Sequence, residues 1–108
     1  MSSSFLIVLS TFPSLAEARK VSKRLIDKRL AACVNLLGPA ESFFWWEGKI
    51  DRAKEYLVLI KTKSTHFNRL QKFLEKNHPY SVPEILALPI LKGNRSYLAW
   101  LQANVRSD

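Results

Sequence analysis

The sequence is poor in the residues that build catalytic centres and metal sites. Its 108 residues include one cysteine, two histidines, three glycines and only nine acidic residues. A single cysteine cannot form an intrachain disulfide, which is typical of a reducing compartment, and three scattered glycines form no phosphate-binding loop. The spacing also shows no Ser-His-Asp or Cys-His arrangement. We therefore expect a protein that is not an enzyme and that carries no organic cofactor.

Long apolar runs are lacking as well. The run behind the N-terminus covers only residues 5–9, which is shorter than the roughly 7–15 residues in the core of a signal peptide. No segment approaches the ~18 apolar residues of a membrane span. We therefore expect a cytoplasmic location and no membrane partner. Cys33 lies in an Ala-Ala-Cys-Val segment, so we expect it to be a small buried apolar residue.

The chain does have the composition of one ordinary globular domain. Hydrophobic residues make up 47% and charged residues 24% of a 12.4 kDa chain, values that are typical of folded proteins. We treat residues 1–108 as a single domain, in which residues 1–4 form a flexible tail because they are small and polar after the initiating methionine.

The apolar patterns predict a β-α-β-β-α-β order followed by a C-terminal helix. The expected strands cover residues 5–10, 34–50, 54–62 and 84–91. The helices are expected to start near residue 15 with Ser14 as the N-cap, near residues 64–65 with Ser64 or Thr65 as the N-cap, and near residue 95. A bend or bulge is expected at Gly38-Pro39, a turn at residues 47–49, and the second helix must end by residues 77–78 before Pro79. Two βαβ crossovers that share a hairpin give an α+β, ferredoxin-like sandwich with both helices on one face.

An aromatic block marks the long hairpin. Side chains alternate along a strand, so two of its members face each way; the block is Phe43, Phe44, Trp45 and Trp46. Two helices can cover only one face of the sheet. Two hypotheses remain open: the second face pairs with other copies of the chain, or the C-terminal helix covers it with Tyr97 and Trp100.

The net charge of +8 comes from 17 basic and 9 acidic residues. Residues 19–29 contain six of the basic side chains and one acid. Such a helix is either a solvated surface or a phosphate-binding face. The hairpin strand at residues 55–61 lacks the aromatic motif with which RNA-binding domains of this topology contact bases. We therefore do not expect a nucleic-acid partner.

The two histidines have different settings. His66 lies in the first turn of the second expected helix, and we expect it to be exposed to solvent. His78 is held in a stiff loop before Pro79. Its imidazole is either satisfied by backbone groups or is a single metal ligand, and one ligand alone does not make a site.

Four motifs resemble those of the CutA family, which is named for divalent-cation tolerance. They are AACVN at residues 31–35, WEGK at 46–49, HPY with VPE at 78–84, and YLAW at 97–100. They occur in the family's order between about residues 5 and 105. The resemblance implies a ferredoxin-like homotrimer that assembles through long hairpins and edge strands, with Phe44, Trp45, Trp46 and Tyr56 as expected contacts.

The resemblance also implies a function linked to copper and other divalent cations, and an architecture akin to the trimeric PII signalling proteins. The copper site proposed for the family uses a cysteine after the first strand and a His-His pair before Pro-Tyr. Here these positions are Ser10, Asn77 and His78. Copper prefers thiolate and imidazole ligands, so we expect weak metal binding with His78 as the metal ligand. The alternative is a PII-like module that binds a small anion or a partner protein between subunits.

Overall fold

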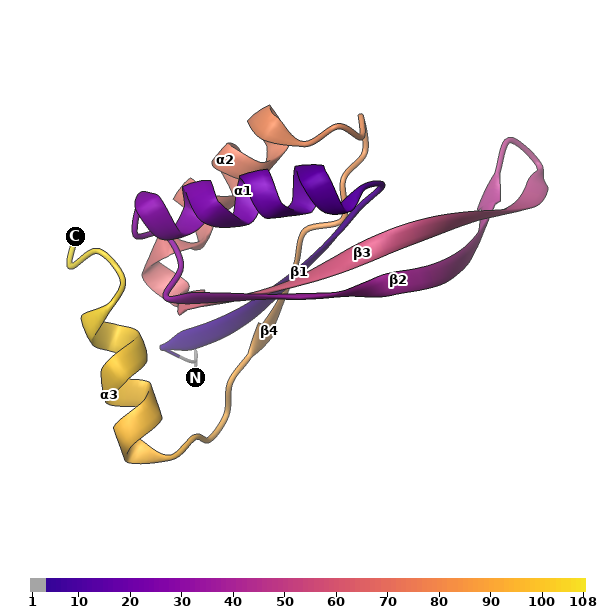
Figure 1. Cartoon of the computed structure of the whole chain (residues 1–108). Helices are drawn as coiled ribbons and strands as arrows, with labels where there is room; N and C mark the ends of the chain where they lie inside the picture. Colours follow the sequence, from indigo (N-terminus) through magenta and orange to yellow (C-terminus); the bar gives the residue numbers. More distant parts are fainter. Residues whose placement is uncertain (1–3) are drawn as a thin grey trace.

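The computed structural model describes residues 4–108, in which four strands and three α-helices follow the expected order (Figure 1). The elements are β1 (Phe5–Phe12), α1 (Leu15–Asp27), β2 (Cys33–Trp46), β3 (Lys49–Lys63), a 3-10 turn (Ser64–His66), α2 (Phe67–Asn77), β4 (Leu86–Pro89) and α3 (Arg95–Ala103). Residues 1–3 of the expected tail lie outside the described residues. The carbonyl of Ser4 accepts the backbone N–H of Ser64 at 2.9 Å, which ties Ser4 to the end of β3.

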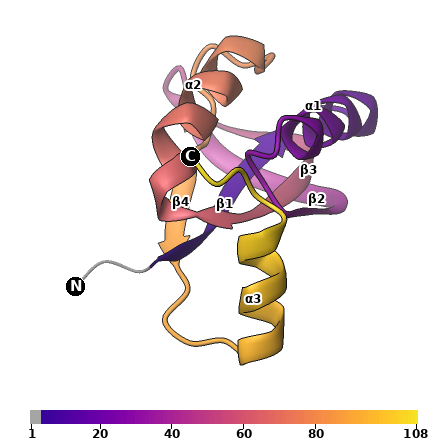
Figure 2. The same cartoon turned by 90° about the vertical axis from the view of Figure 1, so that its left-hand side faces the viewer.

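The sheet confirms the ferredoxin-like prediction. Its strand order is β2-β3-β1-β4 and every pairing is antiparallel. Helices α1 and α2 cover one face (Figure 2). Helix α1 begins where its sequence predicts, because the Ser14 hydroxyl accepts the backbone N–H of Glu17 at 3.2 Å and caps the helix. The six basic side chains of residues 19–29 are all exposed.

The core lies between this helix pair and one face of the sheet. Alternate residues of β1 and β3 point into it and meet the apolar faces of α1 and α2. The fully or almost fully buried members are Val8, Phe12, Ala18, Val21, Leu25, Leu30, Ala31, Val58, Ile60, Leu70 and Leu74. The buried hydroxyl of Thr62 donates to the carbonyl of Leu30 at 2.6 Å, so this polar group is satisfied inside the core.

The hairpin of β2 and β3 projects beyond the two helices (Figure 1). As predicted, its register shifts at the Gly38-Pro39 bend. Glu47 and Gly48 form the turn with φ values of 50° and 78°, the left-handed geometry of tight hairpin turns. Trp46 therefore pairs with Lys49, and β3 begins five residues earlier than its apolar segment indicated.

Helix α3 lies on the other side of the sheet from α1 and α2 (Figure 2). It contacts the sheet near its end, where Lys61 Nζ lies 3.5 Å from the hydroxyl of Tyr97. It leaves the aromatic block open, since Trp45 is 73% and Trp46 54% exposed. The hypothesis that the C-terminal helix covers the second face is therefore confirmed only in part, because α3 lies on that face but docks at the end of β3 opposite the aromatic block.

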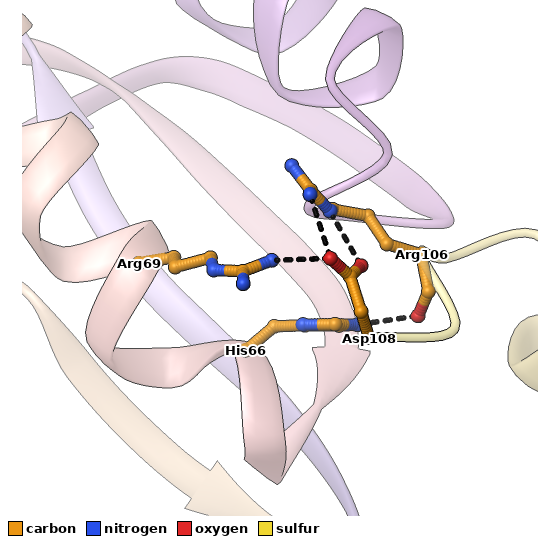
Figure 3. A network of polar contacts seen from close by, with 4 residues as sticks. All are labelled: His66, Arg69, Arg106 and Asp108. Atoms are coloured by element: carbon orange, nitrogen blue, oxygen red, sulfur yellow. Dashed lines mark hydrogen bonds and ion pairs between the residues drawn. The ribbon is translucent and has the colours of Figure 1, made fainter.

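The chain's C-terminal segment is held against α2 (Figure 3). His66 Nε2 bonds the carbonyl of Arg106 at 2.7 Å, and the Arg106 guanidinium donates two hydrogen bonds of 2.9 Å to Asp108. Arg69 lies 3.6 Å from the same carboxylate. His66 is 1% exposed, so the expectation that it is solvent-exposed is wrong. The segment that buries it is distant in sequence, and the helical pattern of residues 64–77 contains no sign of it.

Two smaller expectations also need correction. The second helix is not capped by Ser64 or Thr65, because these residues form a 3-10 turn and α2 starts at Phe67 without a side-chain cap. Cys33 is only partly buried, since it begins β2 at the edge of the sheet, where no further strand covers it. No helix of residues 4–108 has the length and hydropathy that a membrane crossing requires.

Candidate functional site

The candidate site lies where the end of β1 meets the loop that follows α2. Ser10 and Thr11 belong to the last part of β1, and His78 is the first residue after α2. The His78 ring stacks on Phe12 with 4.3 Å between ring centroids. Ser10 is fully buried, and its hydroxyl oxygen lies 3.3 Å from His78 Nε2. The structure therefore brings together two of the three positions that the family resemblance singled out.

Both ring nitrogens of His78 are engaged by the backbone. Nδ1 accepts the N–H of Tyr80 at 3.1 Å, and Nε2 lies 2.9 Å from the carbonyl oxygen of Thr11. A backbone N–H can only donate, so Nδ1 carries the lone pair and Nε2 carries the proton. The ring then donates to Thr11 and holds the loop to β1. The backbone-satisfied alternative is thus what the structure shows.

The environment of His78 favours its neutral form. Burial lowers the pKa of the imidazole below its ordinary value of 6.5, because the charged ring would lose hydration. The Thr11 carbonyl and the carboxylates of Glu17 and Glu55 oppose this effect without overcoming it. A neutral ring is also the form that can accept the Tyr80 N–H.

Tyr80 and Glu55 add a second link between the loop and the sheet. The Tyr80 hydroxyl donates to the Glu55 carboxylate at 2.9 Å, and Glu55 is 8% exposed. Burial, followed by this hydrogen bond, raises the pKa of the Tyr80 phenol to about 12. No sequence pattern predicted this pair. Its only signal was a carboxylate at the start of the apolar stretch of β3.

Asn77 is turned away from Ser10 and His78. Its Oδ1 accepts a hydrogen bond from Arg24 Nη1 at 3.0 Å, and its Nδ2 donates to the Phe73 carbonyl at 2.9 Å. The side chain therefore joins the end of α2 to α1. The Arg24–Asn77 contact was also missed, because residues 53 positions apart show no local pattern.

This arrangement is a poor fit to a preformed copper site. Copper needs free thiolate or imidazole donors, whereas Ser10 offers a buried hydroxyl and Asn77 an amide in use by Arg24. His78 has no free lone pair until Nδ1 leaves the Tyr80 N–H, or until Nε2 gives up both its proton and its contact with the Thr11 carbonyl. Over residues 4–108 no group of three or more His, Cys, Asp or Glu side chains is positioned to hold a metal ion.

Comparison with known proteins gives a consistent picture. The family model described as CutA1 divalent ion tolerance protein matches residues 6–104. The divalent-cation tolerance protein CutA of Thermus thermophilus is 46% identical over 98 residues, which cover 91% of this chain and 95% of that protein.

Two solved structures extend the similarity to the fold. CutA1 from Oryza sativa superposes with a TM-score of 0.95 at 37% identity and covers 99% of this chain and 98% of that one. The periplasmic divalent cation tolerance protein CutA from Archaeoglobus fulgidus has a TM-score of 0.91 at 42% identity. The match covers 94% of this chain and 99% of that one.

Proposed function

Because the chain belongs to the CutA1 divalent ion tolerance family, we propose that it acts as a non-enzymatic homotrimer in the response to divalent metal ions, copper among them. The main support for a trimer is the apolar surface that a single chain leaves exposed to solvent. The aromatic block at the end of the hairpin is 38% exposed at Phe44 and 73% exposed at Trp45. Contiguous exposed apolar surface of this kind marks an interaction surface.

The second face of the sheet supports the same proposal. Directly opposed residues of antiparallel strands share a face, and Leu9 is opposed to Leu59 on β3 and to Leu86 on β4. The apolar side chains on this face include Ile7, Leu9, Leu37, Leu57, Leu59, Leu86 and Leu88. Leu86 and Leu88 are about half exposed. The edge strands β2 and β4 also have unpaired edges, which a second copy can extend.

We propose that the metal interaction at His78 is weak. A metal ion can bind the imidazole only after Nδ1 leaves the Tyr80 N–H, or after Nε2 gives up its proton and its contact with Thr11, and the free energy of that hydrogen bond is then lost from the affinity. Ser10 adds a hydroxyl, which is a poor ligand for copper. The trimer, rather than a fixed metal centre in one chain, is therefore the main functional unit in this proposal.

A PII-like signalling role is the second candidate. The motivating observations are the basic excess, which attracts anions, and the loop at residues 78–80 that His78 and Tyr80 hold rigid against the sheet. A thermal-shift screen of the trimer with nucleotides, inorganic phosphate and metal ions separates the two candidates. A shift with nucleotides alone favours the signalling role, and a shift with metal ions alone favours the metal response.

We propose a cytoplasmic location, based on the single cysteine, which cannot form an intrachain disulfide. The relative from Archaeoglobus fulgidus is described as periplasmic, so the location needs its own test. Fractionation of the host cell with marker proteins for each compartment gives it: recovery in the periplasmic fraction contradicts the proposal.

Light scattering behind a sizing column tests the assembly. The wild type should elute at three times 12.4 kDa. Replacing the exposed pair with Trp45→Ala and Trp46→Ala should lower the mass on dilution, because it removes two aromatic contacts, each of which is worth a few kcal/mol when buried at about 25 cal/mol per Å². Val82→Ala is the matched control, since Val82 is 80% exposed and lies in the loop between α2 and β4, outside the aromatic block. A monomeric wild type refutes the trimer.

A further inference from the structure

A cleft of about 280 Å³ opens between α1 and the end of α2, on the helical side of the molecule. Its walls are Glu17, Lys20, Val21 and Arg24 of α1 and Lys76, Asn77, His78 and Pro79 at the end of α2 and just beyond it. The cleft is thus formed by two helices and the loop that follows the second. The ring nitrogens of His78 are held by Tyr80 and Thr11, which leaves its ring as a wall rather than a ligand.

The charges in this cleft are strongly unbalanced. Lys20, Arg24 and Lys76 contribute three positive charges, and Glu17 contributes the only negative one. In the described part of the chain, the ion pairs join Arg52 to Glu41 and both Arg69 and Arg106 to Asp108. The three cations of the cleft therefore have no carboxylate partner there. Their field attracts anions, and a net charge of about +2 matches a dianion.

Arg24 is already oriented for anion binding. Nη1 donates to Asn77 Oδ1 at 3.0 Å, and the guanidinium carbon lies 5.0 Å from the centroid of the Phe73 ring. Asn77 is fixed in turn by its hydrogen bond to the Phe73 carbonyl. A guanidinium has five N–H donors in a planar fork, and the contact with Asn77 uses one of them. The rest can bind two oxygens of one phosphate group, at little further cost in side-chain entropy.

We propose that this cleft binds a small phosphate-type dianion, with Arg24 as the fork donor and Lys20 and Lys76 as flanking charges. The volume lies just below the range of ligand pockets, which are commonly about 300–1,000 Å³. It therefore suits inorganic phosphate or a phosphate ester with a short organic group and is too small for a dinucleotide. Glu17 weakens the attraction and keeps the affinity moderate. The site depends neither on metal binding at His78 nor on the trimer.

Titration calorimetry with inorganic phosphate, at constant ionic strength and neutral pH, tests the proposal. Arg24→Gln should weaken binding roughly tenfold or more, the fold-change expected for a lost charge-assisted hydrogen bond. Lys20→Gln should also weaken it. Lys23→Gln is the matched control, because Lys23 lies on the same helix but lines a different groove, the one between α1 and β2. It should change the affinity less than twofold.

Two further measurements separate a built site from a general positive field. Asn77→Ala changes no charge but frees Arg24, so it should weaken phosphate binding severalfold. Acetate, a monoanion, should bind more weakly than phosphate. The affinities for inorganic phosphate and for a short phosphate ester are compared in the same way. The compound with the higher affinity shows whether the cleft prefers free phosphate or a phosphate ester. The thermal unfolding midpoint of each variant confirms that it folds.

The proposal is overturned if the wild type shows no phosphate binding at millimolar concentration. It is also overturned if Lys23→Gln weakens binding as much as Lys20→Gln does, or if acetate binds as tightly as phosphate.

Discussion

The backbone N–H of Tyr80 donates to Nδ1 of His78 across 3.1 Å, in a loop that starts directly after α2. The same imidazole bonds the Thr11 carbonyl, and the Tyr80 hydroxyl bonds Glu55. His78 thus attaches the loop to β1, and Tyr80 attaches it to β3. Histidine is a common metal ligand, but in this structure His78 links the loop to β1 through hydrogen bonds.

The neutral state of His78 predicts a loss of stability in mild acid. Burial lowers the imidazole pKa below its ordinary value of 6.5, so the unfolded chain binds the proton more tightly than the folded one. Neutral His78 should therefore make its full contribution to the free energy of unfolding above about pH 6.5. This contribution should be lost as the pH falls toward the lowered pKa of the folded state. Urea unfolding of wild type and His78→Gln over this range measures the difference. Parallel pH profiles for the two proteins contradict the prediction.

The Tyr80 phenol should titrate well above ordinary tyrosines. Its pKa is raised to about 12, so the folded state prefers the protonated phenol and gives up this contribution to stability as the pH rises from about 10 to about 12. The difference in ultraviolet absorbance between wild type and Tyr80→Phe isolates the group. Glu55→Gln should bring the pKa down only in part, because burial is the larger cause. A titration of Tyr80 near pH 10 in the folded wild type disagrees with the structure.

A thiol at position 10 should strengthen copper binding. The Ser10 hydroxyl oxygen lies 3.3 Å from His78 Nε2, so Ser10→Cys places a thiolate donor beside this nitrogen. Once Nε2 gives up its proton, thiolate and imidazole form the ligand pair that Cu(I) prefers. We expect a gain in Cu(I) affinity of at least about tenfold, equal to 1.4 kcal/mol. Competition with a Cu(I) chelator measures it. Ser22→Cys is the control, because Ser22 is also buried but bonds the Ala18 carbonyl within α1. Equal affinities for the two variants rule out the pairing with His78.

The bend in β2 should tolerate no side chain at position 38. A Cβ on Gly38 would lie 2.7 Å from Tyr56 Cδ1 and 3.1 Å from the Glu55 carbonyl. We therefore expect Gly38→Ala to lower the free energy of unfolding by about 1–3 kcal/mol through overpacking.

Gly48→Ala serves as the comparison, since Gly48 has a φ of +78° but no atom within 4 Å of the added carbon. Its cost should be limited to the roughly 1 kcal/mol of the left-handed backbone. Thermal unfolding of the Gly38→Ala and Gly48→Ala variants at equal protein concentration compares the two costs. A larger loss of stability in Gly48→Ala than in Gly38→Ala contradicts the prediction.

Local sequence patterns were enough to predict the fold. Ser14 before an apolar helical spacing located the start of α1, and Gly38-Pro39 within an apolar run located the bulge in β2. The two-sided apolar character of the hairpin predicted a surface that the chain itself leaves open. These features depend on residues close together in sequence, where periodicity and turn preferences act directly.

The site was less predictable, because its contacts join residues that are far apart in the chain. His78 was identified as the candidate ligand, yet the partners that occupy its ring nitrogens include Thr11, 67 positions away. The prediction that His66 is exposed was wrong for the same reason, since the distant C-terminal segment buries it. A local pattern shows that a residue lies on a helix or in a loop, and it does not show which distant segment covers that residue.

Native mass spectrometry of protein purified from its own host tests the central proposal most directly, because it reports stoichiometry and retained ligand together. We predict a trimer of the 12.4 kDa chain that keeps no stoichiometric copper after buffer exchange. A species at the mass of one chain, or a trimer that retains one copper ion per chain, would contradict the account.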